Sequence, residues 1–130
     1  MATSFDSRRT LGQLGERIAR QHLARAGYTI LASNFRTRFG ELDVVAADSR
    51  CLVFCEVKTR IAGTRRGPDG PLDAIGPRKR AQVRAMAREW LTSSAASARP
   101  ARAELRFDAI GILMTRSGRL VSLEHVEDAF

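Results

Sequence analysis

A glutamate and a lysine, Glu56 and Lys58, stand two residues apart where an unbroken apolar run, Cys51 to Cys55, comes to its end. An apolar run without alternation predicts a central strand that is covered on both faces. In a strand, residues two apart point to the same face, so the carboxylate and the ammonium group share one. Charged groups at a buried strand are costly to desolvate unless they act on a ligand, which makes this pair a candidate site for chemistry.

A second carboxylate comes from the segment just before it. Residues 40–47 are predicted to form a partner strand, joined through a polar turn at 48–50. Folding this hairpin brings Asp43 opposite position 54, 55 or 56, depending on the length of the turn, so we expect Asp43 and Glu56 to lie side by side. Two carboxylates with a lysine suit a magnesium site for phosphodiester hydrolysis.

The alternative to a functional site is an exposed ion pair between Glu56 and Lys58, which would show the same Glu-x-Lys spacing. The composition argues against it, because only Lys58 and Lys79 are lysine among 22 basic residues. A position that needed only positive charge would be expected to hold arginine in this chain. A compact ammonium beside a water or a phosphate serves a different purpose.

Length and charge limit the possibilities further. A chain of 130 residues forms one domain, and a net charge of +8 with a pI near 11.1 indicates a polyanionic partner. The sequence shows neither an 18-residue apolar run nor a signal-peptide core, so we expect a soluble, cytoplasmic protein with no membrane partner. Cys51 and Cys55 are too far apart along one strand for a disulfide and are interpreted as buried small hydrophobes. With His22 and His125 distant in sequence, they make no zinc set.

The first helix is expected from Thr10 to Ala26, after a frayed start at residues 1–9. Glu16 lies at the edge of its apolar arc, and two roles stay open for it. It could pair with a basic residue one turn away, or it could be a third carboxylate leaning over the strand site, with Gly12 and Gly15 permitting close approach. His22, on the buried arc, is interpreted as a core histidine.

The second helix is expected from Pro77 to about Leu91. Lys79 falls in its first turn and in line with its core face, where a cation opposes the helix dipole. It could extend out of the core edge, or it could face the same site as Lys58 and hold a phosphate. We favour the second interpretation.

Strands are expected at 28–32, 104–114 and 120–123, and flexible loops at 61–76 and 92–103. Asp108 is interpreted as a structural partner for an arginine rather than as a supporting carboxylate. The order helix, strand, hairpin, helix, strand pair predicts one domain over 1–130, with helices against the faces of a mixed sheet. Candidates for nucleic-acid contacts, with solvated side chains as the alternative, are Arg36, Arg38, Arg60, Arg65, Arg66 and Lys79.

An ordered set of short motifs carries a resemblance to a known family. It resembles the YraN-like family, an uncharacterised bacterial family grouped with the restriction-endonuclease-like, PD-(D/E)xK nucleases and similar to archaeal Holliday junction resolvases. The resemblance covers roughly residues 10–130, with Cys55 and Ala109 as mild departures and an irregular loop at 63–71. Its motifs are Gly15-Glu16-Arg17-Ile18-Ala19, Asn34-Phe35-Arg36, Gly40-Glu41-Leu42-Asp43, Val53 to Arg60, Lys79 and Arg106-Phe107-Asp108.

The resemblance implies a three-layer α/β/α core with a mixed central sheet. It also implies that Asp43 and Glu56 are ligands of Mg²⁺ or Mn²⁺, that Lys58 is the catalytic lysine, and that Glu16 completes the site. We therefore expect a Mg²⁺-dependent nuclease acting on DNA, with branched or junction DNA as the leading substrate. The alternative is a catalytically silent nucleic-acid-binding module of the same fold. Whether the chain acts as a homodimer is left open.

Overall fold

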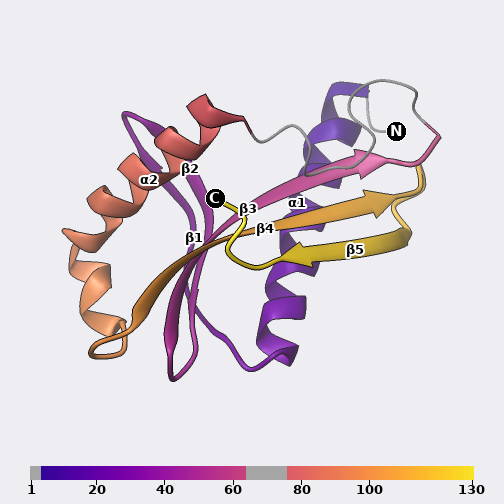
Figure 1. The fold of residues 1–130 in the computed structure, drawn as a ribbon. Coiled ribbons are helices and arrows are strands. Elements are labelled where there is room, and N and C mark those ends of the chain that lie inside the picture. The colour runs from indigo at the N-terminus through magenta and orange to yellow at the C-terminus, as the bar shows by residue number, and fades with distance from the viewer. Residues whose placement is uncertain (1–3, 64–75) are drawn as a thin grey trace.

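A computed structural model describes residues 4–63 and 76–130 (Figure 1). Its sheet has the strand order β1-β2-β3-β4-β5, in which β3 and β4 are parallel and the other neighbouring pairs are antiparallel. The elements in chain order are α1 (Ser4–Arg25), β1 (Thr29–Thr37), β2 (Gly40–Ala47), β3 (Cys51–Ile61), α2 (Pro77–Leu91), the 3-10 helix η2 (Ser94–Ala98), β4 (Glu104–Met114) and β5 (Leu120–Val126).

The central strand β3 separates two apolar layers. Val53 and Cys55 pack toward α1, whereas Leu52 and Phe54 pack toward α2, as the alternation of a strand dictates. The α1 side is completed by Ala19, Leu23, Val44, Ile110 and Ile112, and the α2 side by Val83, Met86, Ala87 and Trp90. The fold is therefore a three-layer α/β/α arrangement with a mixed sheet, which confirms the expected fold class.

The turn between β2 and β3 fixes the register of the hairpin. Asp48 Oδ1 accepts hydrogen bonds from the backbone N–H groups of Arg50 (2.8 Å) and Cys51 (2.7 Å). Such a side-chain bond to the backbone two residues on is a common way for aspartate to stabilise a tight turn. From this turn the two strands pair in register from Ala47 with Leu52 as far as Val44 with Cys55.

Several element boundaries differ from those expected. The helix α1 begins at Ser4, so the frayed start over residues 1–9 is wrong from residue 4 onward. The Thr10 capping pattern sits inside the helix, because the arginines and leucine around it are good helix formers. β1 and β5 run on to Thr37 and Val126, since each pairs along a neighbouring strand, and the expected loop 92–103 contains η2. Residues 64–75 of the expected loop 61–76, with Arg65 and Arg66, lie outside the described residues.

Among the helices of the described ranges, none has the length and apolar character needed to cross a lipid bilayer.

The contact between α1 and β3 rests on a glycine. Gly15 is buried, and a Cβ atom there would overlap the Thr59 side chain, whereas a Cβ at Gly12 would meet nothing within 4 Å. The close approach expected from both glycines is therefore made by Gly15 alone. It brings the neighbouring Glu16 against the sheet.

These two glycines give a matched pair of substitutions. We expect Gly15→Ala to destabilise the fold by about 1–3 kcal/mol, because the helix must move away from Thr59. Gly12→Ala should stabilise it by up to about 1 kcal/mol, because alanine is the better helix former and has room. Urea unfolding of both variants measures this. Equal effects of the two substitutions would contradict the packing described for Gly15.

Candidate active site

The candidate site lies where the backbone pairing between β2 and β3 ends. β2 and β3 pair as far as Val44 with Cys55, and the next position of β2 is Asp43. Instead of a backbone ladder, Asp43 Oδ2 accepts a hydrogen bond from the backbone N–H of Val57 at 2.8 Å. Continuing the register by one residue sets Asp43 opposite Glu56, so the structure brings together the two carboxylates that the hairpin pattern pairs.

Glu56 is 3% exposed, and its two carboxylate oxygens have different surroundings. Oε1 lies 3.3 Å from the Nζ atom of Lys58 and 3.2 Å from that of Lys79. Oε2 is buried and accepts no hydrogen bond from any residue within the described ranges. Lys79 thus reaches across from the first turn of α2 and faces the same site as Lys58, as the favoured interpretation expected.

The electrostatics of Asp43 reflect this crowding. Burial, and next the negative charge of Glu56, raise the pKa of Asp43 to about 8, although the hydrogen bond from Val57 acts in the opposite direction. The Asp43 and Glu56 carboxylates can hydrogen-bond to each other only while one of them carries a proton. A cation placed between them would remove this repulsion.

Two further carboxylates adjoin Asp43. Ligand oxygens of Glu16, Glu41 and Asp43 all lie within 4.8 Å of one another. Asn34, at a positive φ of 53°, presents its side-chain amide to Glu16 and Glu41. Because both neighbours are acceptors, the amide nitrogen is assigned to this side, where it donates to Glu16 Oε2 (3.0 Å) and to Glu41 Oε1. Burial, then the charge of Glu41, raises the pKa of Glu16.

The structure places Glu16 beside the strand carboxylates, which is the position that the second of its two possible roles requires. It lies among the carboxylates, and the charge of Arg20 affects its pKa less than that of Glu41 does. Sequence reasoning missed Glu41 and Asn34 as site residues. The signal available for Glu41 was its position two residues before Asp43 in one strand.

The residues present fit a divalent cation. The carboxylates of Glu16, Glu41 and Asp43 form one cluster, and Glu56 adjoins it at Asp43. The basic side chains beside these acids are Lys58 and Lys79, which contact Glu56, and Arg36, which lies near Glu41. The unpaired, buried Oε2 of Glu56 supplies an acceptor without a donor. Carboxylate oxygens are the ligands that Mg²⁺ and Mn²⁺ prefer.

The arginines expected to contact nucleic acid lie in different surroundings. Arg36 is exposed and lies 3.7 Å from Glu41 Oε2, at the rim of the carboxylate cluster. Arg38 is exposed and stacks over the Phe39 ring, 5.0 Å from its centroid. Arg60 is half-buried near the end of β3, beyond Lys58.

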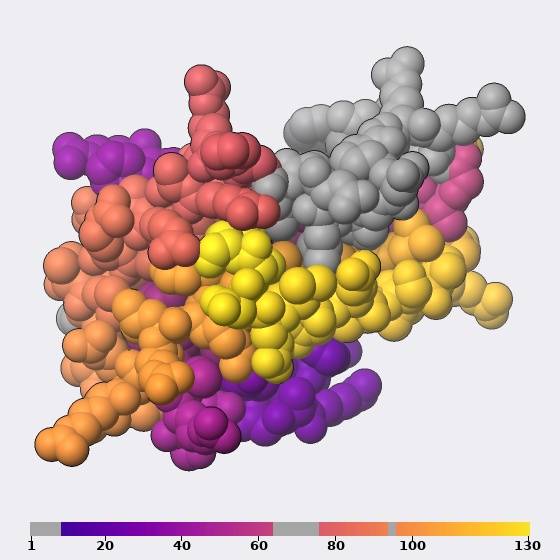
Figure 2. Space-filling view, in the orientation of Figure 1, coloured from indigo at the N-terminus to yellow at the C-terminus, as the bar shows by residue number. Residues whose placement is uncertain are grey.

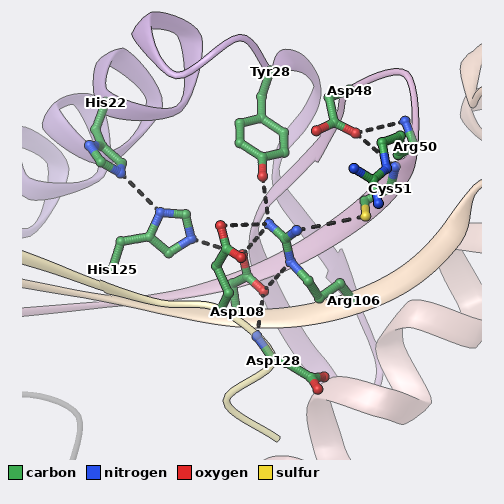
Figure 3. A network of polar contacts seen from close by, with 10 residues as sticks. His22, Tyr28, Asp48, Arg50, Cys51, Arg106, Asp108, His125 and Asp128 are labelled. Carbon is green, nitrogen blue, oxygen red and sulfur yellow. Dashed lines mark hydrogen bonds and ion pairs between the residues drawn. The ribbon is translucent and has the colours of Figure 1, made fainter.

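A separate polar network lies on the α1 side of the sheet, where Asp108 is paired with Cys55 (Figure 3). Arg106 donates to both oxygens of Asp108 (2.9 and 2.8 Å) and to the hydroxyl of Tyr28 (2.6 Å). His125 contacts Asp108 at 2.8 Å and His22 at 2.9 Å, so the chain of contacts joins β4 and β5 to α1. Burial alone would raise the pKa of Asp108, but the bonds from His125 and Arg106 outweigh it and lower that pKa.

This network contains one contact that the sequence did not predict and agrees with two expectations. His22 and His125 are distant in sequence yet in direct contact, and Cys55, Asp108 and His125 group closely enough to suggest a metal site. Arg106 already supplies the positive charge there, so the cluster is structural, as the arginine partnership of Asp108 indicated. His22 is half-buried against the core, as interpreted from its helix position.

Comparison with known sequences places the chain among close relatives. The sequence model of a family described as "Uncharacterised protein family UPF0102" matches residues 15–112, a range that includes Glu16, Asp43, Glu56, Lys58 and Lys79. A UPF0102 protein of Acidothermus cellulolyticus is 43% identical over 100% of both chains. One of Frankia casuarinae is 42% identical over 92% of this chain and 95% of its own. One of Geobacter metallireducens is 43% identical over 94% and 93%.

Proposed function

The chain belongs to the uncharacterised protein family UPF0102, and from the carboxylates and lysines that its fold gathers we propose that it is a magnesium-dependent nuclease acting on DNA. Membership confirms the expectation of an uncharacterised bacterial family. The resemblance to restriction-endonuclease-like nucleases and junction resolvases belongs to the proposal, with branched DNA as the leading substrate.

The observation that carries the proposal is the Glu56 carboxylate. One of its oxygens is buried without a hydrogen-bond donor in the described structure, and the other is shared by two lysines. A buried carboxylate oxygen needs a partner, which here is either a proton shared with Asp43, whose pKa is raised, or a cation that replaces this proton. With Asp43 beside it, a divalent cation is the partner that its surroundings accommodate.

Each residue would then have a defined task. Asp43 and Glu56, with the Val57 carbonyl, would hold Mg²⁺, and Glu16 and Glu41 would hold the waters around it. When bound, Mg²⁺ supplies a water of lowered pKa and neutralises charge that develops on the phosphate. Lys58, whose side chain is 35% exposed, would orient that water or donate to a phosphate oxygen. Lys79 binds a neighbouring phosphate, and the net charge of +8 attracts the strand.

A substrate panel tests the proposal. Four-way junctions, flaps, single strands and duplexes should be incubated with the protein in Mg²⁺, in Mn²⁺ and in chelator. We expect metal-dependent cleavage that Asp43→Ala and Glu56→Ala abolish. DNA affinity should fall linearly in log K with log salt, because each phosphate contact releases counterions.

Two outcomes would contradict it in different ways. Absence of cleavage, with DNA bound equally well by the wild type and by both alanine variants, would favour the silent binding module. Salt-insensitive binding, or no binding of any nucleic acid, would remove DNA as the partner altogether.

A further inference from the structure

The tip of the β1–β2 hairpin carries an exposed aromatic ring. Phe39 is 38% exposed, and among the residues whose side-chain burial is described (9–63, 76–93 and 96–130) it is the one aromatic in the set of exposed large hydrophobic side chains. Figure 2 shows this tip, drawn purple, projecting beside the coral surface of α2. Single exposed apolar side chains are common on proteins, so exposure alone assigns no role to Phe39.

The surroundings of Phe39 distinguish it from such residues, because the tip is fixed in place. Gln82 of α2 donates its side-chain amide to the Phe39 carbonyl. The next residue, Gly40, has a φ of +134°, and a Cβ there would run into the Gln82 side chain. The backbone that carries the ring is therefore held against α2 at the tip of the hairpin.

Two adjoining hollows open beside the ring. One, of about 220 Å³, is lined by Phe39, Ala85 and Arg88, and the other, of about 640 Å³, by Phe35, Arg36 and Arg38. Glu89 and Thr92 line both, so the two hollows adjoin between the hairpin and α2, with Phe39 in the smaller, and together they are called the groove.

The charge of the groove selects its occupant. Three arginines, Arg36, Arg38 and Arg88, and one acid, Glu89, line the groove, and Arg36 also lies 3.7 Å from Glu41. The guanidinium of Arg38 lies over the Phe39 ring, 5.0 Å from its centroid. An aromatic platform flanked by arginines is the combination with which proteins hold unpaired nucleotides, the ring stacking on a base and the guanidinium groups binding phosphates.

The groove and the candidate site lie along the same helix. Lys79, which contacts Glu56, is one turn from Gln82, and Arg88 is nine residues beyond Lys79, or roughly 14 Å at 1.5 Å per residue. Phe39 is likewise four residues from Asp43, at the start of β2. A strand bound in the groove would thus continue along α2 toward the carboxylates.

We propose that the groove at Phe39 binds an unpaired nucleotide strand next to the site of cleavage. This inference rests on the proposed function, which it extends by naming the class of substrate: DNA with a single-stranded portion, such as a flap or the open centre of a junction. Duplex DNA, whose bases are stacked inside, offers no base to the Phe39 ring.

The test compares single-stranded and duplex binding by the same oligonucleotide. A labelled strand carrying 2-aminopurine is titrated without divalent metal, alone and annealed to its complement. We expect Phe39→Ala to weaken single-strand binding about tenfold, which corresponds to ~1.4 kcal/mol. It should also abolish the change in 2-aminopurine fluorescence, while duplex affinity stays within about twofold. Phe39→Tyr, which keeps the ring, should behave as the wild type.

Leu120→Ala is the matched control, because Leu120 is also exposed (49%) but lies on β5. It should change neither affinity. Unchanged single-strand binding by Phe39→Ala, or equal weakening of both DNA forms, would overturn the inference. If metal-dependent cleavage persists in that case, the proposed function survives and only the groove assignment fails. If the wild type binds no DNA form, both fail together.

Discussion

Replacing Asp43 by asparagine should make the protein more stable and inactive at once. At pH 8 we expect Asp43→Asn to raise the free energy of unfolding by about 1–3 kcal/mol. The introduced amide can still accept from Val57 N–H and can donate to the unpaired oxygen of Glu56. Cleavage should fall at least about a thousandfold, or ~4 kcal/mol of barrier, because a metal ligand is lost.

The gain in stability should depend on pH with a definite sign. The pKa of Asp43 in the folded protein, about 8, lies above its value in the unfolded chain. The folded state therefore binds more protons between these pKa values, and the stability of the wild type falls as pH rises through that window. The advantage of Asp43→Asn should be small near pH 4 and largest near pH 8.

Thermal unfolding from pH 4 to pH 8.5, with and without Mg²⁺ or Mn²⁺, measures both effects. The wild type should gain stability from metal, most at high pH, and Asp43→Asn should gain none. Asp48→Asn is a control of opposite sign, because hydrogen bonds from Arg50 and Cys51 lower the pKa of Asp48. Its loss of stability should be present at neutral pH and fade in acid. A destabilised Asp43→Asn at pH 8, or one that still responds to metal, would contradict the cation site.

Replacing Lys58 by arginine should distinguish a catalytic role of the Lys58 ammonium group from a purely electrostatic one. Lys58→Arg keeps the positive charge, so a purely electrostatic role would tolerate it. A lysine that acts on a water or a phosphate needs a compact donor at a fixed distance, and a planar, longer guanidinium would be misplaced. We expect normal folding, near wild-type binding of metal and DNA, and at least about a hundredfold loss of cleavage, or ~3 kcal/mol.

Lys79 provides the matched comparison, because its ammonium group contacts the same Glu56 oxygen at nearly the same distance, 3.2 against 3.3 Å. Lys79→Arg should change DNA binding slightly and cleavage far less than Lys58→Arg. Lys58→Met, which removes the charge but keeps the stem, reports the combined loss. Cleavage by Lys58→Arg at the wild-type rate would reduce Lys58 to a member of a basic surface.

The features that the sequence predicted correctly are those set by neighbouring residues within one segment. The hairpin, the span of α2, the span of β4 and the faces of α1 follow from periodicity and turn chemistry within each segment. The placing of Lys79 also followed, because its angle on the helix put it on the core face. Glu41 and Asn34 were missed, since the bridge from Asn34 depends on a positive φ and on how α1 lies over β1 and β2.

The meeting of His22 with His125 was missed for a related reason. The two residues are separated by more than a hundred positions, and their contact depends on β5 being placed beside β4 and under α1. No periodicity within a segment encodes that placement. Long-range pairing is decided by the packing of whole elements.

The Asp48 turn also governs where the chain can accept insertions. Surface turns usually tolerate added residues, since they touch little else. Here one extra residue would slip β3 against β2 and send Glu56 and Lys58 to the α1 side of the sheet. Two extra residues would restore the face but offset Glu56 from Asp43. The length of the Asp48 turn therefore cannot change without moving the site residues, although Asp48 lies five residues from Asp43, the nearest carboxylate of the site.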